Sequence, residues 1–281
     1  MIRLRLLSNN QWKCDHNQPA WEKQGLDCSA AVREEGFARL YAEALPDVIG
    51  GQEISFAMGD ELIRALSRRG LRYAMLFGRD TPILFRPDRL ELVDSDFSLY
   101  PDEFPNHEGS FNNSKTKSWA LAVFRVKESG KCFLFATTHL WWKSGNPASS
   151  HYQAFSDEAR AYQLGLLMDQ IDEYQAVYRC PAVFCGDLNA DYRSLALRIA
   201  FERGYMHAHD VAVEYRDESR GYHPCGPNGF GPMSEGDFNN AIDHILVRDA
   251  PAGFVRRFER YTPDYYMPLS DHSPVWVDVA F

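Results

Sequence analysis

The chain has little of several features that would narrow its interpretation at once. Its six cysteines form no CxxC pair, so a structural zinc site is not expected. No apolar run is long enough to span a membrane. No repeat, low-complexity tract or Pro/Gly/Ser-rich linker divides the sequence. We therefore expect one domain, 1–281, without a transmembrane segment.

Positive charge is also scarce. The sequence has 30 Lys and Arg against 39 Asp and Glu, a formal net charge of −9. A chain of this kind does not coat nucleic acid or anionic membrane by bulk electrostatics. A nuclease stays open, because a metal ion and a few local cations can hold one phosphate, and a metal site itself needs clustered carboxylates.

The cysteines and the first residues bear on the cellular compartment. Cys132 and Cys185 lie in apolar, strand-like runs, and we interpret them as small core hydrophobes. Disulfides stay open for the other four, although a chain with 45% apolar residues has core enough without them. The opening MIRLRLLSNN is typical of a strand rather than a leader, so a cytoplasmic location is the expectation.

Helical and strand-like patterns alternate along the sequence. Helices are expected over residues 30–44, 59–69, 151–173 and 193–203. Strands are expected over 2–7 (half-exposed), 47–50, 73–77, 83–85, 119–126, 132–139, 181–187, 242–247 and 274–281. A loop rich in Gly and Pro covers 221–236. This interleaving predicts an α/β or α+β fold with mixed sheets.

The strongest local signal is GDLNAD, residues 186–191, which follows the apolar run PAVFC. Asp187 and Asn189 are two residues apart, so in extended chain both side chains point to one side. They follow a buried strand, where ligand groups collect in α/β sheets. A carboxylate and an amide there can hold a water molecule and a phosphate oxygen. A simple turn is the structural alternative, because Gly, Asp and Asn favour turns.

Two further motifs combine aspartate with histidine. SDHSPV, 270–275, puts Asp271 and His272 directly before the last strand, and an imidazole that titrates near neutrality suits proton transfer. IDHILV, 242–247, embeds Asp243 and His244 in an apolar strand. A buried Asp243 would be stabilised by orienting a catalytic imidazole. A strand-entry turn and a solvated strand edge are the structural alternatives.

Three weaker candidates also end strands. TTHLWW, 137–142, contains His139, which in isolation is more typical of a structural histidine. GGQE, 50–53, contains Glu53, and LLSNNQW contains Asn10. Taken together, six strand ends in succession carry Asn, Glu, His, Asp-x-Asn, Asp and Asp-His. These are the hard oxygen ligands and proton-transfer groups that metal-assisted phosphoester hydrolysis requires.

This order resembles the endonuclease/exonuclease/phosphatase superfamily, the deoxyribonuclease-I-like enzymes. GDLN with a terminal SDHSP carries most of the resemblance, which runs from Asn10 to Pro274. It implies a four-layer α/β sandwich, with two central mixed β-sheets packed face to face and helices outside. The choice of Asn10 over Asn9 rests on register, and Gly51 replaces the bulky apolar residue that is usual before QE.

The resemblance also implies roles for the motif residues. Glu53 is the expected principal Mg²⁺ ligand, with Asn10 and Asp271 nearby, and Mn²⁺ is an acceptable substitute. His272, oriented by Asp243, would assist proton transfer and stabilise the transition state. Asp187 and Asn189 would position the attacking water and the phosphate. His139 would be a second phosphate-binding or acid histidine. His244 receives no chemical role.

The function predicted from the sequence is that of a Mg²⁺-dependent phosphoester hydrolase, a phosphatase or phosphodiesterase. A nuclease or deadenylase-like exonuclease on DNA or RNA is the main alternative, and phosphoinositide phosphatases and sphingomyelinases stay open. A catalytically inactive binding scaffold is a further alternative, which the presence of Glu53, Asp187 and His272 disfavours. Specificity is expected in residues 97–114, in 141–150 and in the 221–236 loop, where Trp141 and Trp142 could stack on a base, a sugar or a lipid surface.

Overall fold

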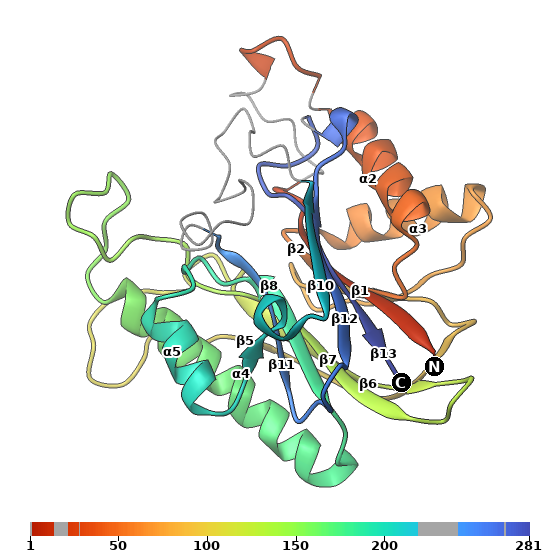
Figure 1. Ribbon diagram of the computed structural model, residues 1–281. Coiled ribbons are helices and arrows are strands. Elements are labelled where there is room, and N and C mark those ends of the chain that lie inside the picture. The colour runs from red at the N-terminus through yellow and green to blue at the C-terminus, as the bar shows by residue number, and fades with distance from the viewer. Residues whose placement is uncertain (1, 14–21, 28, 219–240, 267) are drawn as a thin grey trace.

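The computed structural model describes residues 2–13, 22–27, 29–218, 241–266 and 268–281. Two β-sheets pack face to face, and helices cover their outer faces (Figure 1). This arrangement confirms the predicted four-layer α/β sandwich with two central mixed sheets. Among the residues that the structure describes, every helix is too short or too polar to span a bilayer.

The first sheet has seven strands in the order β10-β12-β13-β1-β2-β4-β3. Their bounds are β10 Glu214–Glu218, β12 Val255–Tyr261, β13 Val275–Ala280, β1 Arg3–Asn10, β2 Val48–Gln52, β4 Ile83–Phe85 and β3 Ala74–Leu76. Strands β1 and β2 run parallel, whereas β1 and β13 run antiparallel. The carboxyl ends of β1 and β2 therefore lie beside the amino end of β13.

The second sheet has six strands in the order β5-β6-β7-β8-β11-β9. Their bounds are β5 Leu90–Leu99, β6 Ser118–Val126, β7 Cys132–His139, β8 Ala182–Asp187, β11 Asp243–Arg248 and β9 Met206–His207. Strands β7 and β8 are parallel, and β11 is antiparallel to β8. The carboxyl ends of β7 and β8 thus adjoin the amino end of β11.

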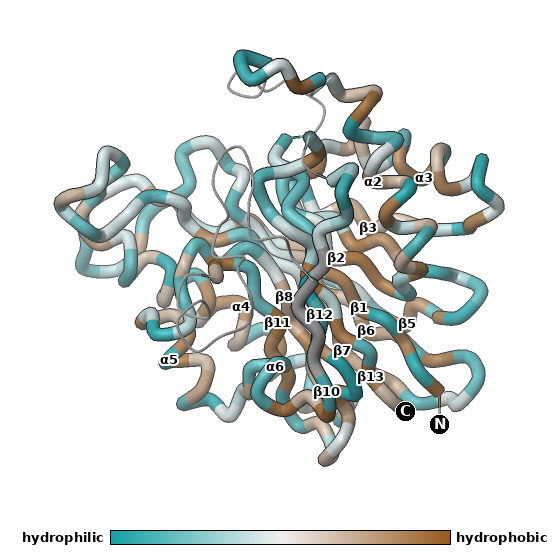
Figure 2. The backbone as a smooth tube through the Cα atoms, turned by 45° about the horizontal axis from the view of Figure 1, so that its top comes forward, coloured by the Kyte–Doolittle hydropathy of each residue, from teal (hydrophilic) through white to brown (hydrophobic). Residues whose placement is uncertain are grey.

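The helices form the outer layers. Helices α2 (Ala30–Ala44) and α3 (Phe56–Arg68) pack on the first sheet, and α4 (Ser156–Tyr178) and α5 (Leu195–Glu202) pack on the second. A short α6 (Ala208–Val211) follows β9. Figure 2 shows apolar stretches along the central strands and polar stretches in the connecting loops.

Alternation along the central strands separates a core between the two sheets from a core under the helices on each outer face. In β8, Val183 and Cys185 point into the core between the sheets, whereas Ala182 and Phe184 point into the core under α4 and α5. Each face of the strand is thereby buried, as its continuous apolar sequence predicts. The expectation that Cys185 is a core residue is confirmed, and Cys132 is half-buried against the α4 core.

Several predicted boundaries are wrong. The expected half-exposed strand at 2–7 is β1, and it is buried from Leu6 onward because one face packs against the second sheet and the other against the helices. Helix α4 begins at Ser156, after Phe155 in a left-handed conformation, and extends to Tyr178, so the expected range 151–173 is shifted. Strands β5, β9, β10 and β12 were not expected. The predicted loop 221–236 lies outside the described residues.

Candidate functional site

The predicted site residues converge on one edge of the sandwich. Asn10 ends β1, His139 ends β7 and Asp187 ends β8, while Glu53 directly follows β2. Asp243 begins β11 and is paired in register with Asp187. The two sheets therefore contribute to a single site, because the relevant strand ends of both meet at this edge.

One carboxylate oxygen of Asp187 is the meeting point of three side chains. Asn10 donates a hydrogen bond from Nδ2 to Asp187 Oδ2 at 3.0 Å. The Nε2 atoms of His139 and His272 lie 3.4 Å and 3.8 Å from the same oxygen. Burial alone would raise the pKa of Asp187, but the charges of His272 and Lys117 and the hydrogen bond from the Asn189 N–H lower it below its usual range. Asp187 is therefore ionised at neutral pH.

His272 and Asp243 form a buried ion pair. His272 Nδ1 donates to Asp243 Oδ2 at 2.7 Å. Burial lowers the pKa of His272, but the carboxylates of Asp243, Asp271 and Asp187 outweigh it, and the pKa lies well above the usual value. Burial raises the pKa of Asp243 to about 6, against the attraction of His272. With Nδ1 held by Asp243, the Nε2–H of the imidazolium faces Asp187.

The loop before β13 is fastened to β1. Ser270 Oγ donates to the carbonyl of Asn10 at 2.7 Å and accepts from the backbone N–H of His272 at 3.0 Å. Tyr266 OH donates to the His272 carbonyl at 2.8 Å and accepts from Asn9 Nδ2 at 2.8 Å. The Asn9 side chain thus faces Tyr266, while the Asn10 side chain faces Asp187. The register that favours Asn10 as the site residue agrees with this geometry.

The segment after β8 is a turn rather than extended chain. Asn189 has φ 48°, its backbone N–H donates to Asp187 Oδ1 at 2.9 Å, and its Nδ2 donates to the Leu140 carbonyl at 3.1 Å. The premise that extended chain aligns the two side chains is therefore wrong at Asn189. Gly186, within β8, permits the close approach of β7 beside the site: its φ is 151°, and a Cβ there would lie 1.9 Å from the Thr138 carbonyl oxygen.

A buried lysine belongs to the site and was not predicted. Lys117 is 4% exposed, and its Nζ lies 2.5 Å from His139 Nε2. Burial lowers the pKa of Lys117 to about 8, although the carboxylates of Glu53, Asp187 and Asp80 oppose this. Burial and the nearby Lys117 hold the pKa of His139 well below its usual value, so His139 is a neutral acceptor. Nothing in SKTKSW distinguishes Lys117 from Lys115, so the sequence held no usable signal.

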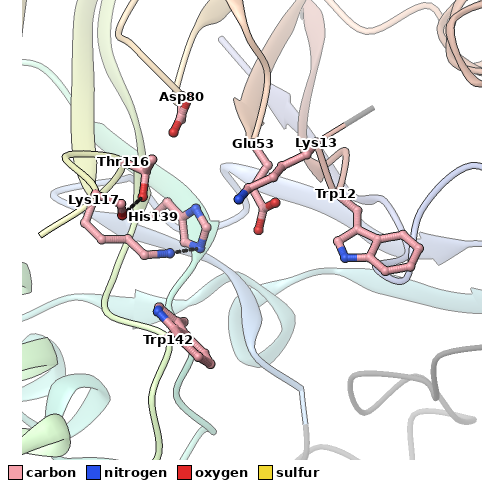
Figure 3. Close-up of a pocket in the computed structure, with 9 residues that line it drawn as sticks. Trp12, Lys13, Glu53, Asp80, Thr116, Lys117, His139 and Trp142 are labelled. Carbon is pink, nitrogen blue, oxygen red and sulfur yellow. Dashed lines mark hydrogen bonds between the residues drawn. The ribbon is translucent and has the colours of Figure 1, made fainter. Parts of the chain in front are cut away.

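A pocket of about 370 Å³ opens beside these groups. Figure 3 shows Glu53 and His139 near its middle, Asp80 toward one side, and Trp12 and Trp142 toward the others. Its lining is completed by Lys13, Ser114, Thr116 and Lys117. Ser114 comes from the expected specificity segment 97–114 and Trp142 from 141–150, whereas Trp12 and Asp80 were not predicted.

Oxygen donors suited to a divalent cation lie at the Glu53 side of the site. Glu53 has φ 56°, a strained conformation that is common at functional positions. Burial raises the pKa of Asp271 to about 6, and the carboxylates of Glu53 and Asp187 add to the shift. A divalent cation would relieve this crowding of negative charge, so Glu53, Asp271 and the Asn10 side chain fit Mg²⁺.

The Asn10 amide would have to turn to act as a ligand. Its Nδ2 lies 3.5 Å from Glu53 Oε1, and its Oδ1 accepts from the Trp12 N–H at 2.8 Å. Within the described residues, Asp187, Asp243 and His272 also bring ligand atoms within 4.8 Å of one another. This second group commits His272 Nδ1 to Asp243 and offers an imidazole nitrogen, which Mg²⁺ disfavours. The oxygen set around Glu53 is the better match.

His244 has a structural environment. It is buried, its Nε2 lies 2.8 Å from the Ala190 carbonyl, and its Nδ1 lies 3.1 Å from His207 Nε2. Burial lowers the pKa of His244 to about 4, so it is neutral. It supports the turn after Asp187 from behind.

Similar folds occur in several solved structures. An endonuclease/exonuclease/phosphatase from Bacteroides vulgatus aligns with a TM-score of 0.74, 22% identity and coverage of 100% of both chains. The mannosyl-6-phosphatase of Bacteroides thetaiotaomicron VPI-5482 aligns at 0.71 and 19%, covering 99% of this chain and 100% of its own. TDP2 of D. rerio, complexed with a single-strand DNA product, aligns at 0.62 and 19%, covering 99% of both.

Sequence comparison identifies the family. No curated protein sequence matches the chain significantly. The model of the Endonuclease/Exonuclease/phosphatase family matches residues 19–272, most of the chain, in agreement with the resemblance of its motifs. The chain belongs to the endonuclease/exonuclease/phosphatase family.

Proposed function

We propose that this chain is a Mg²⁺-dependent phosphoester hydrolase, with Mn²⁺ as an effective substitute. The observation that carries the proposal is the convergence of Asn10, His139 and His272 on one buried oxygen of Asp187. A charged and a neutral histidine beside one ionised carboxylate can bind a phosphate and take up the proton that an attacking water releases. A structural cluster would have no need of a pocket beside it, whereas His139 lines one.

The metal would be held by Glu53, with Asp271 and Asn10 completing the oxygen set. When bound, it would neutralise charge on the phosphate and stabilise the leaving oxygen. Burial, and then the charges of Glu53 and Asp187, raise the pKa of Asp271 to about 6, and a bound cation would favour its ionised form. The assignment predicts oxygen-ligand selectivity, with Mg²⁺ and Mn²⁺ preferred to softer ions.

The remaining residues would act directly on substrate and water. Asp187 would orient the attacking water through the oxygen that Asn10 now contacts, with Asn189 beside it. His272, an imidazolium held by Asp243, would donate from Nε2 to the phosphoryl oxygens, whose negative charge grows in the transition state. Lys117, whose ammonium also faces His139 Nε2, would donate its remaining N–H groups to the phosphate in the pocket, with His139 orienting the ammonium.

The decisive experiment measures hydrolysis of a panel after metal removal and metal return. The panel contains phosphomonoesters, phosphodiesters, single-stranded DNA and RNA, and phospholipids. We expect hydrolysis of at least one class that is lost on exhaustive chelation and restored by Mg²⁺ or Mn²⁺. Calorimetry should detect Mg²⁺ binding to the wild type and not to Glu53→Gln. Full activity with no metal in elemental analysis would disprove the metal assignment.

A nuclease is the second candidate. Trp142 is exposed in the pocket and Lys143 Nζ lies 5.8 Å from the centre of its ring, and a cation beside an exposed indole suits a nucleotide phosphate and its base. The net charge of −9 weighs against a long polyanion. Hydrolysis of the DNA or RNA arm at rates above the monoester arm would favour this candidate over a phosphatase.

A further inference from the structure

The two neighbouring tryptophans after His139 have separate roles. Trp141 is 1% exposed, and its ring lies 5.9 Å from that of Phe111. Trp142 is 46% exposed and lines the pocket. Trp141 is therefore packing, and only Trp142 presents an indole face to a ligand.

Trp12 supplies a second indole from the other sheet. It follows the end of β1 and lines the same pocket as Trp142 (Figure 3). Its backbone has φ 47°, and its N–H is bound to the Asn10 side chain. An indole held on a strained backbone next to a site residue indicates a specified position rather than incidental exposure.

A buried arginine fixes the Trp12 loop. Arg33 of α2 is fully buried and donates from Nη2 to the carbonyls of Gln11 at 2.6 Å and Trp12 at 2.7 Å. Its Nε donates to the Leu269 carbonyl at 2.9 Å. The guanidinium also lies 5.9 Å from the centre of the Trp12 ring. One side chain thereby ties the Trp12 loop to the loop that carries His272.

A second buried arginine fixes the Trp142 loop in a corresponding way. Arg160 of α4 donates from Nη1 to the carbonyls of Trp141 at 3.1 Å and Lys143 at 2.6 Å, one on each side of Trp142. Gln163 Oε1 accepts from the Trp141 N–H at 2.9 Å. Each outer helical layer thus fixes the backbone at one of the two tryptophans, so little backbone entropy is lost when a ligand binds in the pocket.

The polar side of the pocket has unused acceptors. Within the described residues, no side chain forms a hydrogen bond with the Asp80 carboxylate, although the charges of Lys117, Arg79 and Lys13 act on it. Ser114 Oγ and Thr116 Oγ1 are paired with each other at 2.9 Å, and all three residues line the pocket. A ligand that donates hydroxyl groups would satisfy Asp80, and the two hydroxyls can accept or donate in addition.

We infer that Trp12 and Trp142 bind the alcohol part of the phosphoester, and that this part is a ring with an apolar face and a hydroxyl-bearing edge. The inference rests on the proposed function, which puts the phosphate at Lys117, a residue of the same pocket. The indoles take the ring face, and Asp80 takes the hydroxyl edge. A pyranose phosphate and a ribonucleoside monophosphate both have this chemistry, and a pocket of about 370 Å³ is in the range of small-ligand sites.

The test compares ring and open-chain phosphomonoesters. A hexose 6-phosphate, a ribonucleoside 5′-monophosphate and glycerol 3-phosphate are assayed with the wild type, Trp12→Leu, Trp142→Leu and Trp142→Phe. For the preferred ring substrate, we expect each leucine variant to raise KM about tenfold with little change in kcat, because stacking acts on ground and transition states alike. Trp142→Phe should recover part of the loss, and glycerol phosphate should be unaffected. Phe56→Leu, an exposed aromatic of α3 outside the pocket, is the matched control.

Calorimetric binding of the same phosphates to the chelated protein separates this inference from the proposed function. If ring ligands bind at least about fivefold more tightly to the wild type than to Trp142→Leu, ring binding by the indole is supported, whether or not hydrolysis occurs. If ring and open-chain phosphates bind equally and have equal KM in all variants, Trp12 and Trp142 do not bind the ring. That result would leave the proposed hydrolase activity untouched. The more responsive arm, hexose or nucleoside, identifies the source of the ring.

Discussion

Replacement of Lys117 tests the phosphate site at a residue that no motif contains. Lys117 is almost fully buried, with Nζ 2.5 Å from His139 Nε2, and burial lowers its pKa to about 8. If the ammonium holds the substrate phosphate, kcat/KM must fall as pH rises through the pKa of the free enzyme. The protonated fraction drops from about 0.9 at pH 7 to about 0.1 at pH 9, so kcat/KM should fall about tenfold over that interval.

Stability should move in the opposite direction. The pKa of Lys117 is lowered from 10.5 to about 8 on folding, so the unfolded chain binds more protons between these values. The free energy of unfolding should therefore rise with pH across that interval, by about 3 kcal/mol at most, as this group loses its charge. A rise in stability together with a fall in kcat/KM would distinguish titration of Lys117 from partial unfolding at alkaline pH.

The assay is a kcat/KM profile from pH 6 to 10 for the wild type, Lys117→Met and Lys117→Arg. The methionine variant should lose about tenfold or more in kcat/KM at pH 7, because a hydrogen bond from a charged group to the phosphate is lost. Its kcat/KM should show no fall near pH 8, because the titrating amine is gone. The arginine variant keeps its charge, so its profile should also lack this limb. A Lys117→Met enzyme that retains wild-type kcat/KM and the same alkaline limb would refute the assignment.

Three further predictions concern the core of the site. Asp187→Ala and His272→Ala should each lower kcat by at least ~10²-fold; a variant with a native circular dichroism spectrum and a near-wild-type rate would exclude that residue from catalysis. Asp243→Asn should lower both kcat and the pKa of His272, because it removes the carboxylate 2.7 Å from Nδ1. An NMR titration of the chelated protein measures this shift, and unchanged titration with unchanged kinetics would show that Asp243 does not orient the histidine. Arg33→Met should lower the free energy of unfolding in urea by about 3 kcal/mol, since three backbone carbonyls lose a donor worth about 1 kcal/mol each. A decrease below about 1 kcal/mol would show that Arg33 does not hold the two loops together.

The sequence predicted elements whose pattern is local. Helix α2 has the expected range, 30–44, because its apolar positions repeat at helical spacing and face one core. Strand β8 agrees within one residue, since both of its faces are buried. Strand β5 was missed because it lies at the edge of its sheet, where the acidic residues of LELVDSDFSL reach solvent and interrupt the apolar pattern.

The site residues also fall into those that a local pattern marks and those that it does not. Motif residues such as Asp187 and His272 could be proposed because short, ordered sequence signals mark them. Lys117 and Arg33 could not, because their significance comes from contacts between distant parts of the chain. Arg33 binds the carbonyl of Leu269, 236 residues away, and Lys117 meets His139 only because β6 and β7 pair with Ser118 opposite His139. No local pattern encodes such a contact, so only the folded structure identifies these residues.

The distance between the two sheets sets the geometry of the whole site. Asn10, Glu53 and His272 come from the first sheet, whereas His139, Asp187 and Asp243 come from the second.

Just beneath these residues the sheets approach closely at Gly50, where a Cβ would lie 2.6 Å from Cys185 Sγ and 2.9 Å from Thr137. Gln52 Nε2 donates across the same gap to Thr137 Oγ1 at 2.8 Å. A side chain at Gly50 would force the sheets apart and so separate Asn10 from Asp187, although neither residue touches the glycine. Gly50 therefore has a geometric role: it lets the two halves of the site come within hydrogen-bonding distance.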